Sequence, residues 1–312
     1  MHKLLLAALV ISVALTTGVA RAASTYGGQC SVHRSSTPLK VELSVSYQAS
    51  EGGSHTSWMS NTDVPLRSLE GFSPADLSQP GVHHFTVVSD AGSLKCTALA
   101  GHDGMAGTFD FIPNAQFAQA LHSRGLSMPS ERDQFFLALS RFRIATLDKL
   151  LQAGFAVPSV GELASISEHG ISDDYLKAMA DVQFQRKTVH GLVDMRDHGV
   201  SAEFARALTN GHIFSVSDII RARDHGLSAT YLDAVRAKWK SVSVDDIITL
   251  RDHGVSEEYM AGLARIGYRP SVSDIVRMVD HGVSVAFIQR LRNHGYAHLS
   301  VDDIIRLRDT GL

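Results

Sequence analysis

The chain has 312 residues, of which 44% are hydrophobic and 20% are charged, and its formal net charge at pH 7 is −3. This composition is typical of a folded protein, and the length allows two domains of ordinary size. The weak negative charge argues against a nucleic-acid partner, because such proteins usually carry a basic face.

The first 22 residues have the features of a secretory signal peptide. His2 and Lys3 give a basic start, residues 4–15 are apolar, and Ala20-Arg21-Ala22 fits the small-x-small pattern before a cleavage site. A single membrane anchor is the alternative, but the apolar run is shorter than the about 20 residues that a membrane helix needs. We therefore expect cleavage after Ala22, a mature chain with no membrane span, and a periplasmic or secreted location.

Residues 23–113 have the pattern of a small antiparallel β domain. Apolar and polar residues alternate in four segments, 41–47, 85–88, 93–99 and 107–112. The cluster Gly101-His-Asp-Gly104 predicts a turn between the last two segments, and stretches at 50–63 and 71–81 that are rich in turn-forming residues are expected to separate the others. The apolar face of such a sheet needs a cover, and the nearest candidates are the helices that follow it.

The only two cysteines, Cys30 and Cys96, both lie in this predicted domain. Two cysteines in an exported chain suggest one disulfide bond. Closing a loop of this length stabilises a fold by about 4 kcal/mol in the chain-entropy description. Two unpaired thiols are the alternative, and we expect the disulfide.

Residues 114–312 carry an internal repeat. Four segments with nearly identical openings begin at Ser215, Ser243, Ser271 and Ser300, in steps of 28, 28 and 29 residues. The same opening, in weaker form, begins at Thr188, Ser159 and Ser130. Its pattern, Ser-x-x-Asp or Ser-x-x-Glu before an apolar stripe, resembles the capping box at the start of a helix.

Each of these helices is predicted to end at a His-Gly dipeptide, because glycine tolerates the left-handed conformation found after a helix. The glycines are Gly170, Gly199, Gly226, Gly254 and Gly282. A second helix is expected to follow, with a serine cap and an aromatic residue in its first turn: Tyr175, Phe204, Tyr231, Tyr259 and Phe287.

Stacking explains why such helix pairs would be stable, since an isolated pair cannot bury its apolar stripe. Residues 114–125 look like the second helix of an eroded first repeat, and the segment from Ser300 onward looks like a half repeat that covers the end of the stack. We therefore predict an α-solenoid of two-helix repeats over residues 114–312. The expected fold class is α+β.

Two polar columns accompany the repeats. The first consists of histidines: His169, His198, His225, His253 and His281. Equivalent positions in stacked helices lie roughly 10 Å apart, whereas zinc ligands lie about 2 Å from one ion. We therefore expect these histidines to cap helix C-termini and not to bind a metal.

The second column consists of Arg-Asp pairs that precede the histidines. We expect a solvated face, or ion pairs within each repeat. The alternative is an interaction ridge along the solenoid, made of Arg196, Asp197, Arg223, Asp224, Arg251 and Asp252.

Common catalytic motifs are missing from the sequence, among them His-Glu-x-x-His, Gly-x-Ser-x-Gly and the phosphate-binding P-loop. His83-His84 and His102-Asp103 fall in expected loops without partners at motif spacing. We therefore expect a protein that is not an enzyme, with no catalytic, cofactor-binding or metal-binding residues and no cofactor.

The repeat unit Ser-Val-Asp-Asp-Ile-Ile-x-Leu-Arg-Asp-His-Gly-Val-Ser-x-x-Tyr resembles repeats of uncharacterised exported bacterial proteins. Similar repeats accompany antirepressor membrane metallopeptidases of the β-lactam-sensing kind, and residues 85–114 resemble the β segment that often precedes them. The chain carries neither the membrane helices nor the zinc motif of the peptidase part, so peptidase activity does not carry over. The resemblance implies an extracytoplasmic accessory region.

These observations favour an exported interaction module that binds an unidentified protein or peptide of the cell envelope. The rival hypothesis is an extracytoplasmic sensor of a small ligand, with its site at the junction of the β domain and the solenoid. One concave polar pocket at the junction would favour the sensor, and a long, shallow, repeated surface would favour the module.

Overall fold

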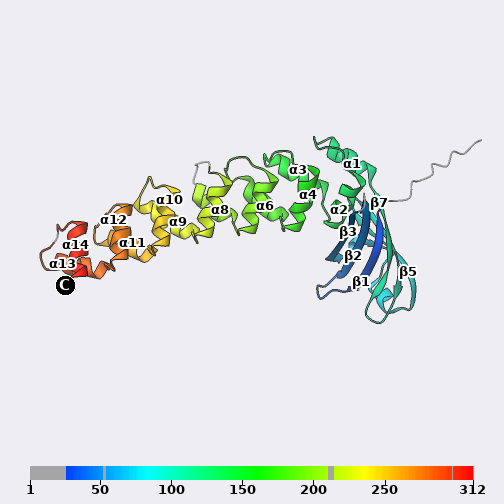
Figure 1. The fold of residues 1–312 in the computed structure, drawn as a ribbon, viewed down its shortest axis with the longest axis horizontal. Helices are drawn as coiled ribbons and strands as arrows, with labels where there is room; N and C mark the ends of the chain where they lie inside the picture. Colours follow the sequence, from blue (N-terminus) through cyan, green and yellow to red (C-terminus); the bar gives the residue numbers. More distant parts are fainter. Residues whose placement is uncertain (1–25, 52–53, 210–213, 297, 312) are drawn as a thin grey trace, which may run out of the picture.

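The structure, a computed structural model, describes residues 26–51, 54–209, 214–296 and 298–311. The predicted signal peptide, residues 1–22, lies outside these described residues. Among the described helices, none combines the length and the apolarity that crossing a bilayer would require. A curled sheet stands at one end of an elongated stack of helices (Figure 1).

The sheet has seven strands, all paired antiparallel, in the spatial order β3-β2-β1-β7-β6-β5-β4. The strands are β1 (Gly27–Arg34), β2 (Lys40–Glu51), β3 (Ser54–Pro65), β4 (Leu69–Glu70), β5 (Gly81–Ser89), β6 (Gly92–Ala100) and β7 (Met105–Pro113). Two short 3-10 helices, η1 (Leu66–Ser68) and η2 (Pro74–Ser78), connect β3, β4 and β5.

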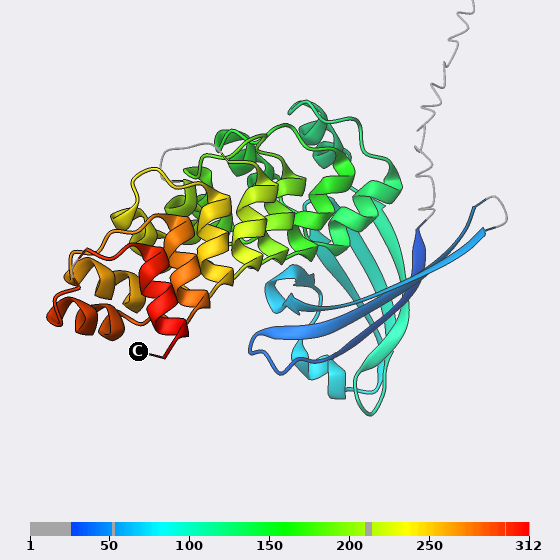
Figure 2. The same ribbon diagram turned by 60° about the vertical axis from the view of Figure 1, so that its left-hand side comes forward.

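The helices form two layers, because each helix packs against the next but one in the chain. Figure 2 shows the successive helices of one layer side by side. The first layer contains α2 (Glu131–Leu139), α4 (Val160–Glu168), α6 (Val189–Asp197), α8 (Val216–Asp224), α10 (Val244–Asp252), α12 (Val272–Asp280) and α14 (Val301–Asp309). The second layer contains α1 (Ala115–His122), α3 (Ile144–Gln152), α5 (Asp173–Ala180), α7 (Ala202–Thr209), α9 (Ala229–Lys238), α11 (Glu257–Arg265) and α13 (Val285–Asn293).

Local sequence signals explain where these helices begin and end. At the start of α10, the Ser243 hydroxyl accepts a hydrogen bond from the backbone N–H of Asp246, whose carboxylate accepts the Ser243 backbone N–H in return. After the helix, Gly254 has a φ of 71°, a conformation that glycine adopts without the strain of a side chain. The predicted repeat boundaries and the α+β fold class are therefore confirmed.

Helix α2 covers the concave side of the sheet. The centroid of the Phe135 ring lies 5.3–5.8 Å from the centroids of four other aromatic rings. Three of them, Tyr47, Phe109 and Phe111, belong to the sheet, and the fourth, Tyr26, immediately precedes β1. Phe135 itself is fully buried. The expectation that the first helices cover the apolar face of the sheet is confirmed, and one continuous core joins the sheet to the solenoid.

Two parts of the sheet differ from the sequence prediction. Within the stretch expected to separate strands, residues 50–51 and 54–63 instead belong to the paired strands β2 and β3. The β1 strand was not predicted, although it pairs with both β2 and β7 at the centre of the sheet. β3 is an edge strand, and an edge strand has only one neighbouring strand and can be rich in serine, threonine and asparagine. The composition of β3 therefore resembles that of a loop.

The predicted disulfide bond is wrong, because Cys30 and Cys96 are both free and buried. Cys30 lies on β1 and Cys96 on β6, and β7 runs between these strands. Two strand spacings of about 4.8 Å exceed the Cα separation of at most about 7 Å that a disulfide tolerates. The Cys30 thiol donates a hydrogen bond to the Thr108 carbonyl at 3.4 Å, and its hydrogen bond with Cys96, together with burial, raises the pKa of the Cys96 thiol.

Candidate functional site

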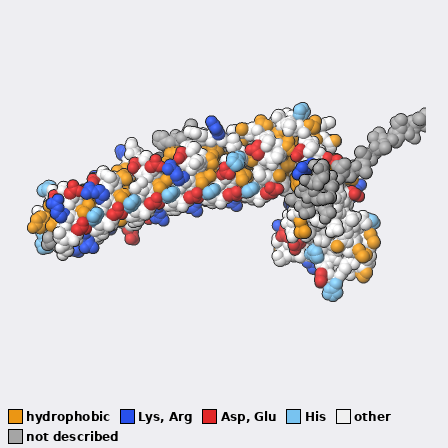
Figure 3. All heavy atoms as spheres, in the orientation of Figure 1, with side chains coloured by type: hydrophobic (Ala, Val, Ile, Leu, Met, Phe, Trp, Pro, Cys, Tyr) orange, Lys and Arg blue, Asp and Glu red, His pale blue; other side chains and the backbone are white. Residues whose placement is uncertain are grey.

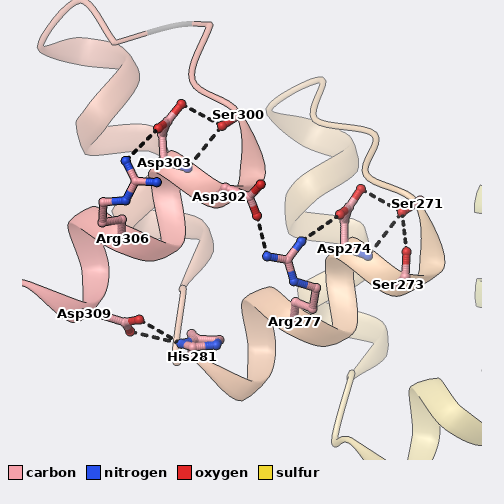
Figure 4. Close-up of polar contacts among 10 residues, drawn as sticks. All are labelled: Ser271, Ser273, Asp274, Arg277, His281, Ser300, Asp302, Asp303, Arg306 and Asp309. Atoms are coloured by element: carbon pink, nitrogen blue, oxygen red, sulfur yellow. Dashed lines mark hydrogen bonds and ion pairs between the residues drawn. The ribbon is translucent and has the colours of Figure 1, made fainter.

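The histidine column joins each repeat to the next. Every Nδ1 atom in it lies 2.7–3.0 Å from a carboxylate of the following repeat. The pairs are His169–Asp197, His198–Asp224, His225–Asp252, His253–Asp280 and His281–Asp309. Acidic and histidine side chains accordingly form a row along the solenoid in Figure 3, and the last pair is drawn in Figure 4.

These histidines do stand at the C-caps of their helices, as predicted. The backbone N–H of His253, for example, donates to the Thr249 carbonyl at the end of α10. The imidazole, however, binds the next repeat and not its own helix. Because the side chains remain 40–46% exposed, each pair contributes no more than about 1 kcal/mol to stability.

The six residues of the predicted ridge all lie in contacts between repeats. Its aspartates are the acceptors of the histidine pairs described above. Its arginines lie over aromatic rings of the preceding second helix, at 5.3–5.9 Å from the ring centroid: Arg196 over Tyr175, Arg223 over Phe204 and Arg251 over Tyr231. All six residues are exposed, which agrees with the predicted solvated face, but their contacts join neighbouring repeats and are not the alternative of ion pairs within one repeat.

Tyrosines in the aromatic column form another contact between repeats, which the sequence did not reveal. The Tyr231 hydroxyl donates to the Val255 carbonyl at 2.9 Å, and Tyr175 and Tyr259 make the same bond to Val200 and Val283. Burial raises the pKa of each of these three tyrosines to about 12. The sequence signal for this contact was a tyrosine in place of a phenylalanine at a buried position, because a buried hydroxyl usually has a hydrogen-bond partner.

Charged pairs also alternate along the first layer. Arg221 of α8 pairs with Asp245 of α10, and Arg277 of α12 pairs with Asp302 of α14 (Figure 4). In α10 the position equivalent to these arginines is Thr249, whose hydroxyl donates to the Asp245 carbonyl. The charged contact therefore joins α8 to α10 and α12 to α14, while Thr249 takes the place of the arginine on α10.

The second layer has two open grooves at equivalent places. One, of about 360 Å³, lies between α3 and α5, and the other, of about 250 Å³, lies between α9 and α11. Five positions of each lining correspond, Ala153, Asp173, Leu176, Lys177 and Ala180 in the first groove and Ala237, Glu257, Met260, Ala261 and Ala264 in the second. Leu176 matches Met260 on the floor, and Ala180 matches Ala264 on the rim. The positions in the later groove follow those in the earlier one by 84 residues, which is three repeats.

At three other interfaces of the second layer an arginine crosses to the preceding second helix or its end. Arg206 of α7 donates to the Ala178 carbonyl at 2.9 Å, Arg236 of α9 donates to Ala207 and Leu208, and Arg292 of α13 donates to Ile266. Counted from the serine that caps each helix, Arg236 and Arg292 occupy the same position as Ala180 and Ala264. The open grooves therefore lie where alanine replaces a crossing arginine.

Other cavities lie outside the second layer. One of about 870 Å³ opens between α8 and α10, where Arg221 and Asp245 form their ion pair. Another of about 660 Å³ lies on the outer face of the sheet, lined mainly by small polar residues of β1, β2 and β7. Within the described ranges, histidines, cysteines and carboxylates form no cluster suited to holding a metal ion.

In comparisons with known proteins, no family model, no curated protein and no solved structure matches this chain. The function is therefore inferred from the chain's own repeated surface, whose chemistry follows from the residues described above.

Proposed function

We propose that this protein is a non-catalytic interaction module of the cell envelope, exported by its N-terminal signal. In this proposal it binds a protein or peptide through the face formed by the second helices. The supporting observation is the recurrence of an open groove at equivalent positions, between α3 and α5 and between α9 and α11. Solenoids commonly bind extended partners through surfaces that repeat along the stack.

The second-helix face suits this role better than the predicted arginine-aspartate ridge. On the ridge, carboxylates are paired with histidines and guanidinium groups lie on rings, so a partner would have to displace contacts that hold neighbouring repeats together. In the grooves, small side chains leave apolar surface accessible, with Leu176 and Met260 at their floors. A partner can cover that apolar surface while the ion pairs of Asp173 with Lys149 and Arg143, which cross the α3–α5 interface, stay in place.

The small-ligand sensor has weaker support. Its site would lie where the sheet meets the solenoid, and there the Phe135 ring packs against Tyr26 and Tyr47. These closely packed rings take up the space that a ligand would need. The resemblance to extracytoplasmic accessory repeats agrees with either function, and the grooves support the module.

Site-specific photocrosslinking in the producing cells tests the proposal. A photoreactive residue is placed at Gln152 or at Ala261, which line the two grooves, and as a control at the exposed Ser217 of α8. We expect the groove positions to crosslink one defined protein and the control position to give no such product. Crosslinks only from Ser217, or none from any position, would contradict the proposal.

A further inference from the structure

The two open grooves share an acidic end. Helix α5 begins with Asp173-Asp174 and helix α11 with Glu257-Glu258. The other second helices of the repeat begin with at most one acid: Ala202-Glu203 in α7, Ala229-Thr230 in α9 and Val285-Ala286 in α13. Asp174, Glu257 and Glu258 are exposed, whereas Asp173 is half-buried and already pairs with Lys149 and Arg143. The paired acids therefore coincide with the two interfaces at which alanine replaces the crossing arginine.

Both grooves also have a basic end. Beyond the lining of the earlier groove, the Lys187 ammonium donates to the carbonyls of Ala180 at 2.6 Å and Ala153 at 3.5 Å and lies over the rings of Phe155 and Phe184. Burial lowers the pKa of Lys187. In the later groove, Lys238 and Arg269 stand at the corresponding end. An eight-residue helix such as α5 is about 12 Å long, so each groove has an exposed acid at one end and a basic group at the other, and in the earlier groove Lys149 and Lys177 also line the surface between them.

This combination specifies a ligand. We infer that each groove binds a protein segment in which an apolar side chain lies between a basic and an acidic one. The apolar side chain fills the space that the arginine leaves, the basic side chain meets the exposed acids, Asp174 in one groove and Glu257 and Glu258 in the other, and the acidic side chain meets the lysine end. The inference rests on the proposed function and adds the chemistry of the partner.

The distance between the grooves adds a second specification. Asp173 and Glu257 are three repeats apart, and repeats stack at roughly 10 Å, so the grooves lie about 30 Å from each other. A partner with two such segments at this separation would engage both grooves. The second contact would then be intramolecular, and the overall affinity would exceed that of one segment.

Selection from a randomised peptide library against the folded full-length chain tests the inference. The consensus peptide is then synthesised with a fluorophore, and its Kd and stoichiometry are measured by anisotropy. We expect a consensus with an apolar residue between basic and acidic residues, and two peptides bound per chain. Two consensus units joined by a spacer of about 30 Å should bind at least tenfold more tightly than one.

Variants that close the grooves give the decisive comparison. Ala180→Arg and Ala264→Arg introduce the residue found in α9 and α13, and each should remove one binding site. Ala180→Leu and Ala264→Leu fill the grooves without adding charge, so they separate filling from repulsion by Lys187 or Lys238. Ala286→Arg, at an exposed position of α13 outside both grooves, is the control and should leave binding unchanged. Circular dichroism establishes that each variant is folded.

Charge is tested separately from filling. Glu257→Gln with Glu258→Gln should weaken binding at the α9–α11 groove by about three- to tenfold, as expected for exposed ion pairs. An absence of selected peptides, a consensus without a basic residue, or binding that survives in the doubly closed variant would overturn the inference. If groove crosslinks to a partner persist in that variant, the proposed function stands and only this ligand assignment fails.

Discussion

Replacing Arg251 distinguishes a contact between repeats from a free interaction ridge. Its guanidinium carbon lies 5.3 Å from the centroid of the Tyr231 ring, which is 1% exposed and belongs to the preceding repeat. A cation–π contact at such a partly exposed site is worth about 0.5–1 kcal/mol. Arg251→Ala should therefore lower the free energy of unfolding by about that amount. The matched change at Arg265, an exposed arginine at the end of α11, should cost less than about 0.5 kcal/mol.

A double-mutant cycle assigns the loss to the ring. Tyr231→Leu removes the ring, so its effect should couple to Arg251→Ala by about 0.5–1 kcal/mol. Tyr231→Phe keeps the ring and removes only the hydroxyl that donates to Val255, so it should cost about 1 kcal/mol and couple to Arg251→Ala by less than about 0.3 kcal/mol. Urea unfolding followed by circular dichroism measures all these values. Equal effects of the two arginine changes, with no coupling to Tyr231→Leu, would refute the contact and favour the free ridge.

Three further predictions follow from single features. Without reductant, Cys30 and Cys96 should resist alkylation in the folded protein and both be labelled after unfolding, as intact mass would show; a chain unlabelled under both conditions would mean a disulfide. Burial raises the pKa of Tyr231 from 10.0 to about 12, so the contribution of this side chain to stability should be intact below pH 10 and lost as the pH rises through 12. Absorbance titration at alkaline pH should detect this late ionisation. Gly254→Val should destabilise by more than about 1 kcal/mol, because a β-branched residue is strained at a φ of 71°; an unchanged urea midpoint would contradict the left-handed cap.

The solenoid could be predicted because its signals are local and repeated. Ser243 and Gly254 determine where α10 begins and ends through hydrogen bonds and φ values within a few residues of each. Repetition of these signals made even the first repeat recognisable, since Asn114 caps α1 where the eroded unit was expected.

The sheet was harder to predict because its pairings are not local. β1 contains Gly27 and Gly28, which give no periodic signal, and its place is set by strands far away in the sequence. The disulfide prediction failed for the same reason, since the position of β7 between the two cysteines depends on strand order.

The candidate site was partly predictable from the sequence. The histidine and aspartate columns were visible in the sequence, but their pairing across repeats depends on how far one unit is displaced from the next. The grooves required a comparison of equivalent positions, in which Ala180 and Ala264 stand where Arg236 and Arg292 occur in other repeats. An alanine in a helix does not by itself indicate a groove, because the groove also depends on which residues pack beside the alanine.

Deletion of one whole repeat tests the modular architecture on which the functional proposals depend. Removing residues 243–270 joins Val242 to Ser271, so that His225 would meet Asp280 in place of Asp252 and this contact would be restored, while Arg221 would meet Ser273 in place of Asp245. Removing residues 243–255 instead places α9 and α11 in direct succession and mismatches their apolar faces. By circular dichroism and urea unfolding, we predict that the whole-repeat deletion stays folded and helical, while the half-repeat deletion loses its cooperative transition. Equal collapse of both chains, or better survival of the half-repeat deletion, would contradict a modular solenoid.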